Sequence, residues 1–281
     1  MSTLEKTNPI QRTFAYFFSI VVSITFIFPF VWMIASSFKT TREILQYPLR
    51  LTAERFTIVA YESLVRIAGN PIGLYLYNSI VIVGFATLLA TAVTSLGAYA
   101  IWRKPRLPLF GLIEKMFLVS IMYPYILLLM PVYVIMFRIG LLGTRVGIIL
   151  FLTLGPVQYF LFREFFAKIP KELIESAQID GAREIQTFAS IVVPMARPVF
   201  LTVLLLSFIL NWENWFPVLV ISTSMKTYTL PVVLFNFDSQ LEVNFPEIMA
   251  LAAVVSVPIM IVFFLTQRRV MDGFAAGSVK G

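Results

Sequence analysis

Six stretches of about 20 mostly apolar residues divide this chain and constrain its fold more than any other feature. A helix of about 20 apolar residues is long enough to cross the hydrocarbon core of a bilayer. It also satisfies its backbone hydrogen bonds internally, as lipid requires. The sequence therefore predicts an all-α membrane protein with six transmembrane helices. The expected spans cover residues 14–35, 76–101, 112–137, 143–161, 200–222 and 248–266.

The composition supports contact with lipid rather than a soluble core. Hydrophobic residues make up 59% of the chain, charged residues 13%, and the mean hydropathy is +0.86. A soluble domain leaves much of its chain in water and cannot bury that much apolar surface. The first stretch is too long for a signal peptide and lacks a cleavage site, so we expect it to remain. We interpret residues 1–281 as a single transmembrane domain.

The chain has no cysteine and no histidine. This excludes disulfides, thiol catalysis, zinc sites built on His or Cys, and hydrolases that need a histidine base. No G-x-x-x-x-G-K-[ST] loop is present, so the chain does not bind ATP in that way. We expect no catalytic residue, no metal site and no cofactor in this chain, and therefore not an enzyme.

The basic residues predict the orientation in the membrane. An even number of spans places both termini on the same side. With the N-terminus inside, cytoplasmic segments hold 14 Lys and Arg residues and outer segments hold 8, which favours cytoplasmic termini. Arg103, Lys104 and Arg106 lie directly after the second span. We interpret the net charge of +7 as this cytoplasmic bias, not as binding to nucleic acid.

Two connectors are long enough to have their own structure. Residues 40–75 mix polar and apolar positions and contain the turn signal Gly69-Asn70-Pro71, which suggests a small outer cap. Residues 163–198 form a cytoplasmic loop with helical periodicity. Connectors of this length in a compact protein usually have a function.

The cytoplasmic loop predicts a short helix between Pro170 and Gly181. Proline suits a helix start, Glu172 and Glu175 favour its first turns, and Gly181 marks its end. Leu173 and Ala177 lie four residues apart and share a face.

A second helix is expected after Gly181, before Pro194 and Pro198 break the chain. Ile185, Phe188, Ala189 and Val192 would form an apolar stripe suited to the membrane surface.

The fifth span carries polar residues near its middle. At 100° per residue, four of them share one face, and amide and indole groups suit recognition of a sugar. Pro217 cannot donate to the carbonyl of Glu213, so a kink is expected there. The alternative is that these residues join helices to one another. The candidate substrate path consists of Ser207, Asn211, Asn214 and Trp215, with Asn78, Tyr123 and Tyr125 as weaker members.

The cytoplasmic loop resembles the EAA motif of ABC-importer permeases. That motif reads E-A-A, three residues, G, nine residues, then I-x-L-P. The chain differs from it at Ser176 and Val193. It matches at the required spacing at Glu175, Ala177, Gly181, Ile191 and Pro194.

Nearly the whole chain is similar to the second permease of maltose-type carbohydrate importers. That family usually has Trp-Asn-Glu where this chain has Trp212-Glu213-Asn214. The resemblance implies the type I ABC-importer permease fold, with a coupling-helix loop, in a bacterial inner membrane. It is carried by residues 28–32, 37–39, 78–79, 98–100 with Arg103, 131–133 and 276–281.

The resemblance also implies partners. They are a second homologous permease, two ATPase subunits that hold ATP and Mg, and an extracytoplasmic binding protein that delivers the sugar. The C-terminal tail, with Gly277, Lys280 and Gly281, would also contact the ATPase. The residues that would couple to the ATPase are Leu173, Glu175, Ala177, Asp180, Gly181 and Pro194.

Two other functions remain possible from the residues. A permease of the same fold could import a solute other than a sugar. A passive channel or an intramembrane enzyme belongs to a different class. Transport through a passive channel would survive depletion of ATP, and an enzyme would turn over its substrate without partner subunits.

Overall fold

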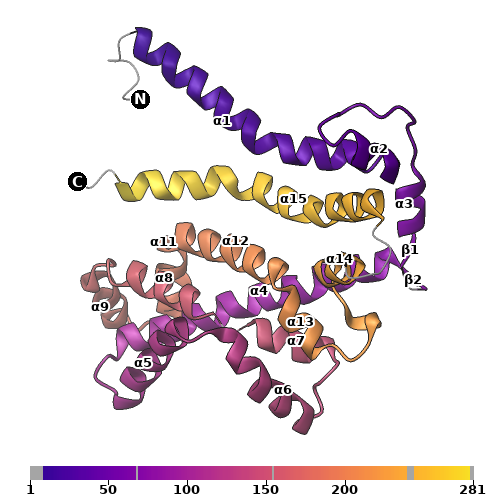
Figure 1. Cartoon of the computed structure of the whole chain (residues 1–281). Helices are drawn as coiled ribbons and strands as arrows, with labels where there is room; N and C mark the ends of the chain where they lie inside the picture. The colour runs from indigo at the N-terminus through magenta and orange to yellow at the C-terminus, as the bar shows by residue number, and fades with distance from the viewer. Residues whose placement is uncertain (1–8, 68, 154, 239–243, 279–281) are drawn as a thin grey trace. The chain divides into compact units, whose positions relative to one another are not determined.

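The computed structural model describes residues 9–67, 69–153, 155–238 and 244–278, and helices dominate it (Figure 1). The elements are α1 (Pro9–Ser36), α2 (Thr41–Gln46), α3 (Val59–Leu64), β1 (Arg66–Ile67), β2 (Asn70–Pro71), α4 (Ile72–Arg103), α5 (Pro108–Met122), η2 (Tyr125–Leu128), α6 (Leu129–Arg138), α7 (Arg145–Leu152), α8 (Pro156–Phe166), α9 (Lys171–Ile179), α10 (Glu184–Thr187), the π-helical turn η3 (Phe188–Val192), α11 (Val193–Met195), α12 (Arg197–Glu213), α13 (Trp215–Ile221), η4 (Met225–Thr227), α14 (Leu230–Asp238) and α15 (Phe245–Ser278).

The chain divides into two compact units. The first contains the residues up to Ile72 together with Asn236–Val257, and the second contains Gly73–Phe235 together with the residues from Pro258 onward. The long helix α15 therefore contributes to both.

Three helices are long and apolar enough to cross a membrane, namely those at Ile10–Ser36, Ile72–Arg103 and Phe245–Gln267. They coincide with the first, second and sixth expected spans. Three bent helix pairs also qualify, which raises the number of possible spans to 6 in the described residues. The count of six transmembrane helices therefore stays a prediction.

The third expected span, over residues 112–137, is not one continuous helix. The helix α5 ends at Met122, and the segment from Tyr125 to Arg138 leaves at 114° to it. Pro124 is the physical reason, because the residue before a proline is driven out of the helical conformation. Tyr123 accordingly has a ψ of 130°.

The fourth and fifth expected spans are interrupted as well. The helices α7 and α8 meet at 45°, with Gly155 and Pro156 at the join. The helices α12 and α13 are separated by Asn214, whose φ and ψ are −82° and 58°. The kink predicted from Pro217 is confirmed, since α12 ends at Glu213, whose carbonyl Pro217 cannot bond.

The second unit has two apolar clusters along α4, and Figure 1 shows the elements that contribute to them. One cluster gathers side chains of α8, α9, η3 and α12 around the C-terminal end of α4, including Tyr99, Phe162 and Ile174. The other joins α7, α13 and α14 to the middle of α4, around Ile82 and Ala86. The loop at residues 163–198 is thus packed onto the end of α4.

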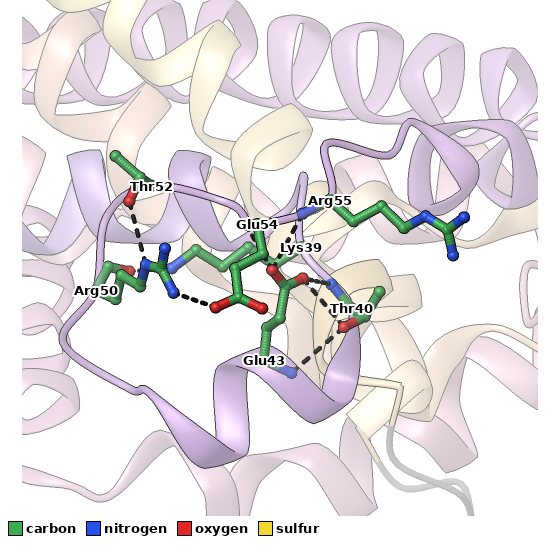
Figure 2. A network of polar contacts seen from close by, with 7 residues as sticks. All are labelled: Lys39, Thr40, Glu43, Arg50, Thr52, Glu54 and Arg55. Atoms are coloured by element: carbon green, nitrogen blue, oxygen red, sulfur yellow. Dashed lines mark hydrogen bonds and ion pairs between the residues drawn. The ribbon is translucent and has the colours of Figure 1, made fainter.

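In the first unit, a polar network shapes the segment that was expected to form an outer cap (Figure 2). Thr40 and Glu43 form a capping box at the start of α2. One carboxylate oxygen of Glu43 also accepts hydrogen bonds from the backbone N–H groups of Glu54, at 2.6 Å, and Arg55, at 3.3 Å. Glu43 therefore joins α2 to the loop that follows it.

The network shifts the pKa values of two of its members. Hydrogen bonds from the Thr40 backbone, and then from the Glu54 and Arg55 backbones, lower the pKa of Glu43 to about 2. Burial lowers the pKa of Lys39, and Glu43 opposes that shift. The Lys39 ammonium donates to the carbonyl of Arg50, which holds the loop from its other side.

We expect Glu43→Gln to loosen the loop at residues 47–58, because the amide retains one acceptor oxygen where the carboxylate has two. A carboxylate whose folded pKa is lowered contributes stability above its ordinary pKa, and this is lost as the pH falls through the folded value. The protection that this carboxylate gives the wild-type loop should therefore be complete above its usual pKa of 4.5, decline as the pH falls below that value, and be lost at about pH 2. Hydrogen exchange at the Glu54 and Arg55 amides measures this, with the exposed Glu62→Gln as control. Equal exchange in both variants would contradict the role of Glu43.

Candidate functional site

The helix α9 begins after Pro170 and ends before Gly181, as these two residues predict. Pro170 precedes it with a ψ of 128°, and Glu172 lies in its first turn. At its end, Gly181 N–H donates to the Gln178 carbonyl at 3.0 Å and Ala182 N–H to the Ala177 carbonyl at 2.9 Å. This is a Schellman motif, which requires positive φ at the residue after the cap. Gly181 has a φ of 82°.

The two sides of α9 differ in burial. Ile174 is completely buried in the cluster at the end of α4 and anchors the helix there. Leu173 is 43% exposed and Ile179 is 85% exposed, so two large apolar side chains remain uncovered. Glu175 and Asp180 are exposed beside them, and Ala177 is half-buried. The helix therefore presents a mixed apolar and acidic surface that this chain does not cover.

The segment after Gly181 corrects one expectation. The structure has the short helix α10 and then a π-helical turn in place of a regular helix over 185–192. Phe188 and Val192 are buried in the protein's own core, while Ile185 and Ala189 are exposed. The expected membrane-facing stripe is therefore divided, because the packing against α4 takes up half of it. Pro194 is exposed in the short α11.

A cavity of about 460 Å³ lies within the second unit. Three helix interruptions border it, at Tyr125 after Pro124, at Pro156, and at Asn214. Asn211 and Asn214 supply amide groups in an otherwise mostly apolar wall. The lining residues are Ile113, Met116, Phe117, Ser120, Tyr125, Leu128, Val132, Phe151, Leu152, Pro156, Asn211 and Asn214.

Asn211 is the most informative polar residue of this cavity. It is 7% exposed, and its Nδ2 has no hydrogen-bond partner among the residues that the structure describes. A buried amide donor without a partner costs free energy, so a ligand or water with an acceptor would stabilise it. The expected path residues Tyr125, Asn211 and Asn214 are thus brought together.

Other expected path residues lie elsewhere. Ser207 is fully buried and does not line the cavity. Trp215 stacks on Phe235, with ring centroids 3.8 Å apart and planes at 18°. Tyr123 is 47% exposed and also lies outside the lining.

Asn78 holds the fold together. Its Nδ2 donates to the carbonyls of Lys226 and Tyr228 at 2.8 and 2.9 Å. Its Oδ1 accepts from Arg145 Nε at 2.9 Å. The neighbouring Ser79 hydroxyl accepts from Leu230 N–H at 2.7 Å. These contacts leave Asn78 away from the cavity.

The expected tail contact is mostly outside the described residues. Gly277 lies in the last turn of α15, and Lys280 and Gly281 are beyond the described part. In the part of the chain that the structure describes, no group of three or more His, Cys, Asp and Glu residues could hold a metal ion.

Comparison with known proteins gives a consistent group of relatives. Residues 94–273 match the family described as binding-protein-dependent transport system inner membrane component. The chain is 31% identical to the trehalose/maltose transport system permease protein of Thermococcus litoralis, over 94% of this chain and 95% of that protein. It is 28% identical to the diacetylchitobiose uptake system permease protein of Streptomyces coelicolor, over 94% and 95% of the two chains.

A solved structure shares the fold. It is a chain of a bacterial ABC transporter involved in the import of the acidic polysaccharide alginate. The TM-score is 0.79 at 21% sequence identity, over 93% of this chain and 98% of that one. At this identity the likeness concerns the fold alone.

Gly181 provides a test of the loop geometry. A Cβ at this position would meet no atom within 4 Å, so any cost of substitution comes from the backbone. We expect Gly181→Val to lose about 1–2 kcal/mol or more of loop stability, since the left-handed conformation is strained for such residues. Gly181→Asn should be tolerated, because asparagine adopts this conformation far more readily. Limited proteolysis of residues 171–187 measures the difference, and equal cleavage of both variants would contradict it.

Proposed function

Because this chain belongs to the family of binding-protein-dependent transport system inner membrane components, we propose that it is the permease subunit of an ATP-driven importer for a sugar or sugar derivative. The relatives named for trehalose/maltose and diacetylchitobiose transport support the substrate class. The cavity, with two amides among apolar side chains, agrees with a ligand that has both hydroxyl groups and apolar ring faces.

The single observation that supports this proposal most strongly is the exposed surface of α9, the helix that contains the start of the EAA-type motif. Leu173 and Ile179 are exposed although the rest of the loop is packed onto the core. Uncovered apolar side chains on a loop outside the membrane indicate a protein partner. We therefore assign α9 as the helix that docks on an ATPase subunit, with Glu175 and Asp180 beside the apolar contact.

The partners follow from the family. We propose a second homologous permease, two ATPase subunits that bind ATP and Mg, and an extracytoplasmic binding protein. The chain has no P-loop, so hydrolysis belongs to the ATPase subunits. We place the subunit in a bacterial inner membrane as a multi-pass protein with both termini in the cytoplasm.

The substrate path is proposed to run along the cavity. Transporters often build solute sites where membrane helices are interrupted, since free backbone groups and polar side chains meet there. Asn211 and Asn214 lie at such an interruption and face the cavity. We assign Ser207 and Trp215 to packing between helices. Of the four residues expected on one face of the fifth span, only Asn211 and Asn214 are therefore proposed to contact the substrate.

Reconstitution of the full complex in vesicles tests the proposed function. Uptake of maltose, trehalose or diacetylchitobiose should require ATP, the ATPase subunits and the binding protein. Uptake that persists after depletion of ATP would instead indicate a passive channel. Uptake of none of these sugars, but of another solute with ATP, would retain the permease and contradict the substrate class.

The docking of α9 gives a specific prediction. Ala177→Trp should release the ATPase subunits or abolish ATP-driven uptake, because overpacking in a fitted contact costs about 1–3 kcal/mol. Ala167→Trp, on an exposed residue just before this loop helix, serves as the control and should retain both. Co-purification of the ATPase and uptake are the measurements. Normal values for Ala177→Trp would exclude α9 as the docking helix.

The cavity gives a second prediction. Asn211→Ala and Asn214→Ala should each reduce uptake at least tenfold, while assembly and ATPase activity are retained, because the substrate loses an amide partner in a desolvated site. Thr202→Ala changes a polar residue of the same helix outside the cavity and should have little effect. Unchanged uptake in both asparagine variants would assign these residues to helix packing.

A further inference from the structure

The carboxylate of Glu184 receives four hydrogen bonds from two neighbouring elements. Arg103 Nε and Nη2 each lie 3.3 Å from one of its oxygens, and the Tyr99 hydroxyl donates to Oε2 at 2.8 Å. Gln178 Nε2 donates to Oε1 at 3.1 Å. Tyr99 and Arg103 belong to the last turns of α4, and Gln178 belongs to α9. One side chain at the start of α10 therefore connects α4 to the helix that docks on the ATPase.

This cluster differs from an ordinary surface ion pair. An isolated exposed pair contributes little to stability because water screens it. The Glu184 side chain is 45% exposed, but the Arg103 side chain is only 19% exposed and Tyr99 only 6%, so two of its partners are largely shielded from water. The two-point contact of a guanidinium with a carboxylate also fixes the orientation of both groups. Lys104 and Arg106 follow directly after the end of α4, are exposed, and form no ion pair with the described residues.

The polar cluster lies directly on an aromatic core. The Tyr99 ring is 5.0 Å from that of Phe188 and 6.5 Å from that of Phe166, measured between centroids. Ile174 of α9 is buried in the same core. The loop is therefore attached to α4 at three points, by Ile174, by Phe188 and by the Glu184 carboxylate.

The loop itself contains two features that would let it deform. Gly181 turns the chain directly after α9, and a π-helical turn interrupts the helical hydrogen-bond pattern at Phe188–Val192. A displacement of α9 could be absorbed at these points instead of reaching the span. A contact that spans from Gln178 across Glu184 to Arg103 bridges the Gly181 turn and opposes that loss.

We infer that Glu184 and Arg103 are positioning residues that hold the ATPase-docking loop rigidly against α4, so that movement of α9 reaches the transmembrane span. This inference rests on the proposed function. Glu184 lies in the nine-residue spacer between Gly181 and Ile191, so it is not one of the matched positions of the EAA-type motif. Its role is to transmit the motion, whereas the docking surface is formed by α9.

The experiment uses the full complex in vesicles and measures sugar molecules imported per ATP hydrolysed. Arg103→Gln and Glu184→Gln should each lower this ratio about fivefold or more, the lower end of coupling between distant sites. ATPase co-purification and the hydrolysis rate should remain, since the α9 surface is untouched. The exposed Arg106→Gln is the matched control and should leave the ratio unchanged.

The exchanged pair Arg103→Glu with Glu184→Arg separates transmission from mere folding. It restores the ion pair with reversed polarity, and the Gln178 amide oxygen and the Tyr99 hydroxyl oxygen can accept hydrogen bonds from the guanidinium at position 184. The ratio should therefore recover to within about twofold of wild type, beyond what independent effects would predict. An unchanged ratio in both single variants, or no recovery in the exchanged pair, would overturn the inference. If the wild-type complex shows no ATP-dependent uptake, the proposed function itself fails, which is a distinct result.

Discussion

A backbone inside lipid has no water to replace a lost hydrogen bond, so every interruption of a membrane helix must be covered by protein. In this chain the interruptions at Pro124, Pro156 and Asn214 all border one cavity. Pro124 and Pro156 lack the N–H that a continuous helix would use, so the helices break at these points. The non-helical backbone and the amides of Asn211 and Asn214 next to it therefore lie around one cavity.

The loop at residues 163–198 combines a buried interior with an exposed outer surface. Its apolar side chains Phe188 and Ile174 are buried with Phe166 and Tyr99 in one cluster at the end of α4. Its outer surface keeps Leu173 and Ile179 exposed. A loop that buried all its apolar side chains would have nothing to offer a partner, and one that buried none would not hold its shape. Ile174 and Leu173 are neighbours in the sequence, and the first is buried in the core while the second is exposed on the surface that we propose for the ATPase partner.

The length of the apolar runs and the positions of proline and glycine made much of this structure predictable. The uninterrupted apolar runs predicted α1, α4 and α15, and Pro170 and Gly181 predicted the limits of α9. The 114° bend between α5 and the segment from Tyr125 onward was not predicted. Pro124 signals a helix end there, but the apolar run on both sides of it is long enough for one continuous span. The structural position of Asn78 could not be read from the chain. Its partners at Lys226 and Tyr228 become neighbours only through tertiary packing.

That last contact has a consequence for synthesis of the protein. The Lys226 carbonyl lies 148 positions after Asn78, so α4 leaves the ribosome long before its partner exists. At about 5–20 residues per second, the interval is about 7–30 s. Throughout it, the Asn78 amide needs a temporary partner in water, lipid headgroups or the insertion machinery. Closure of these bonds therefore requires the chain to have been made at least as far as Tyr228, and a chain truncated before Lys226 lacks both carbonyl partners of the Asn78 amide.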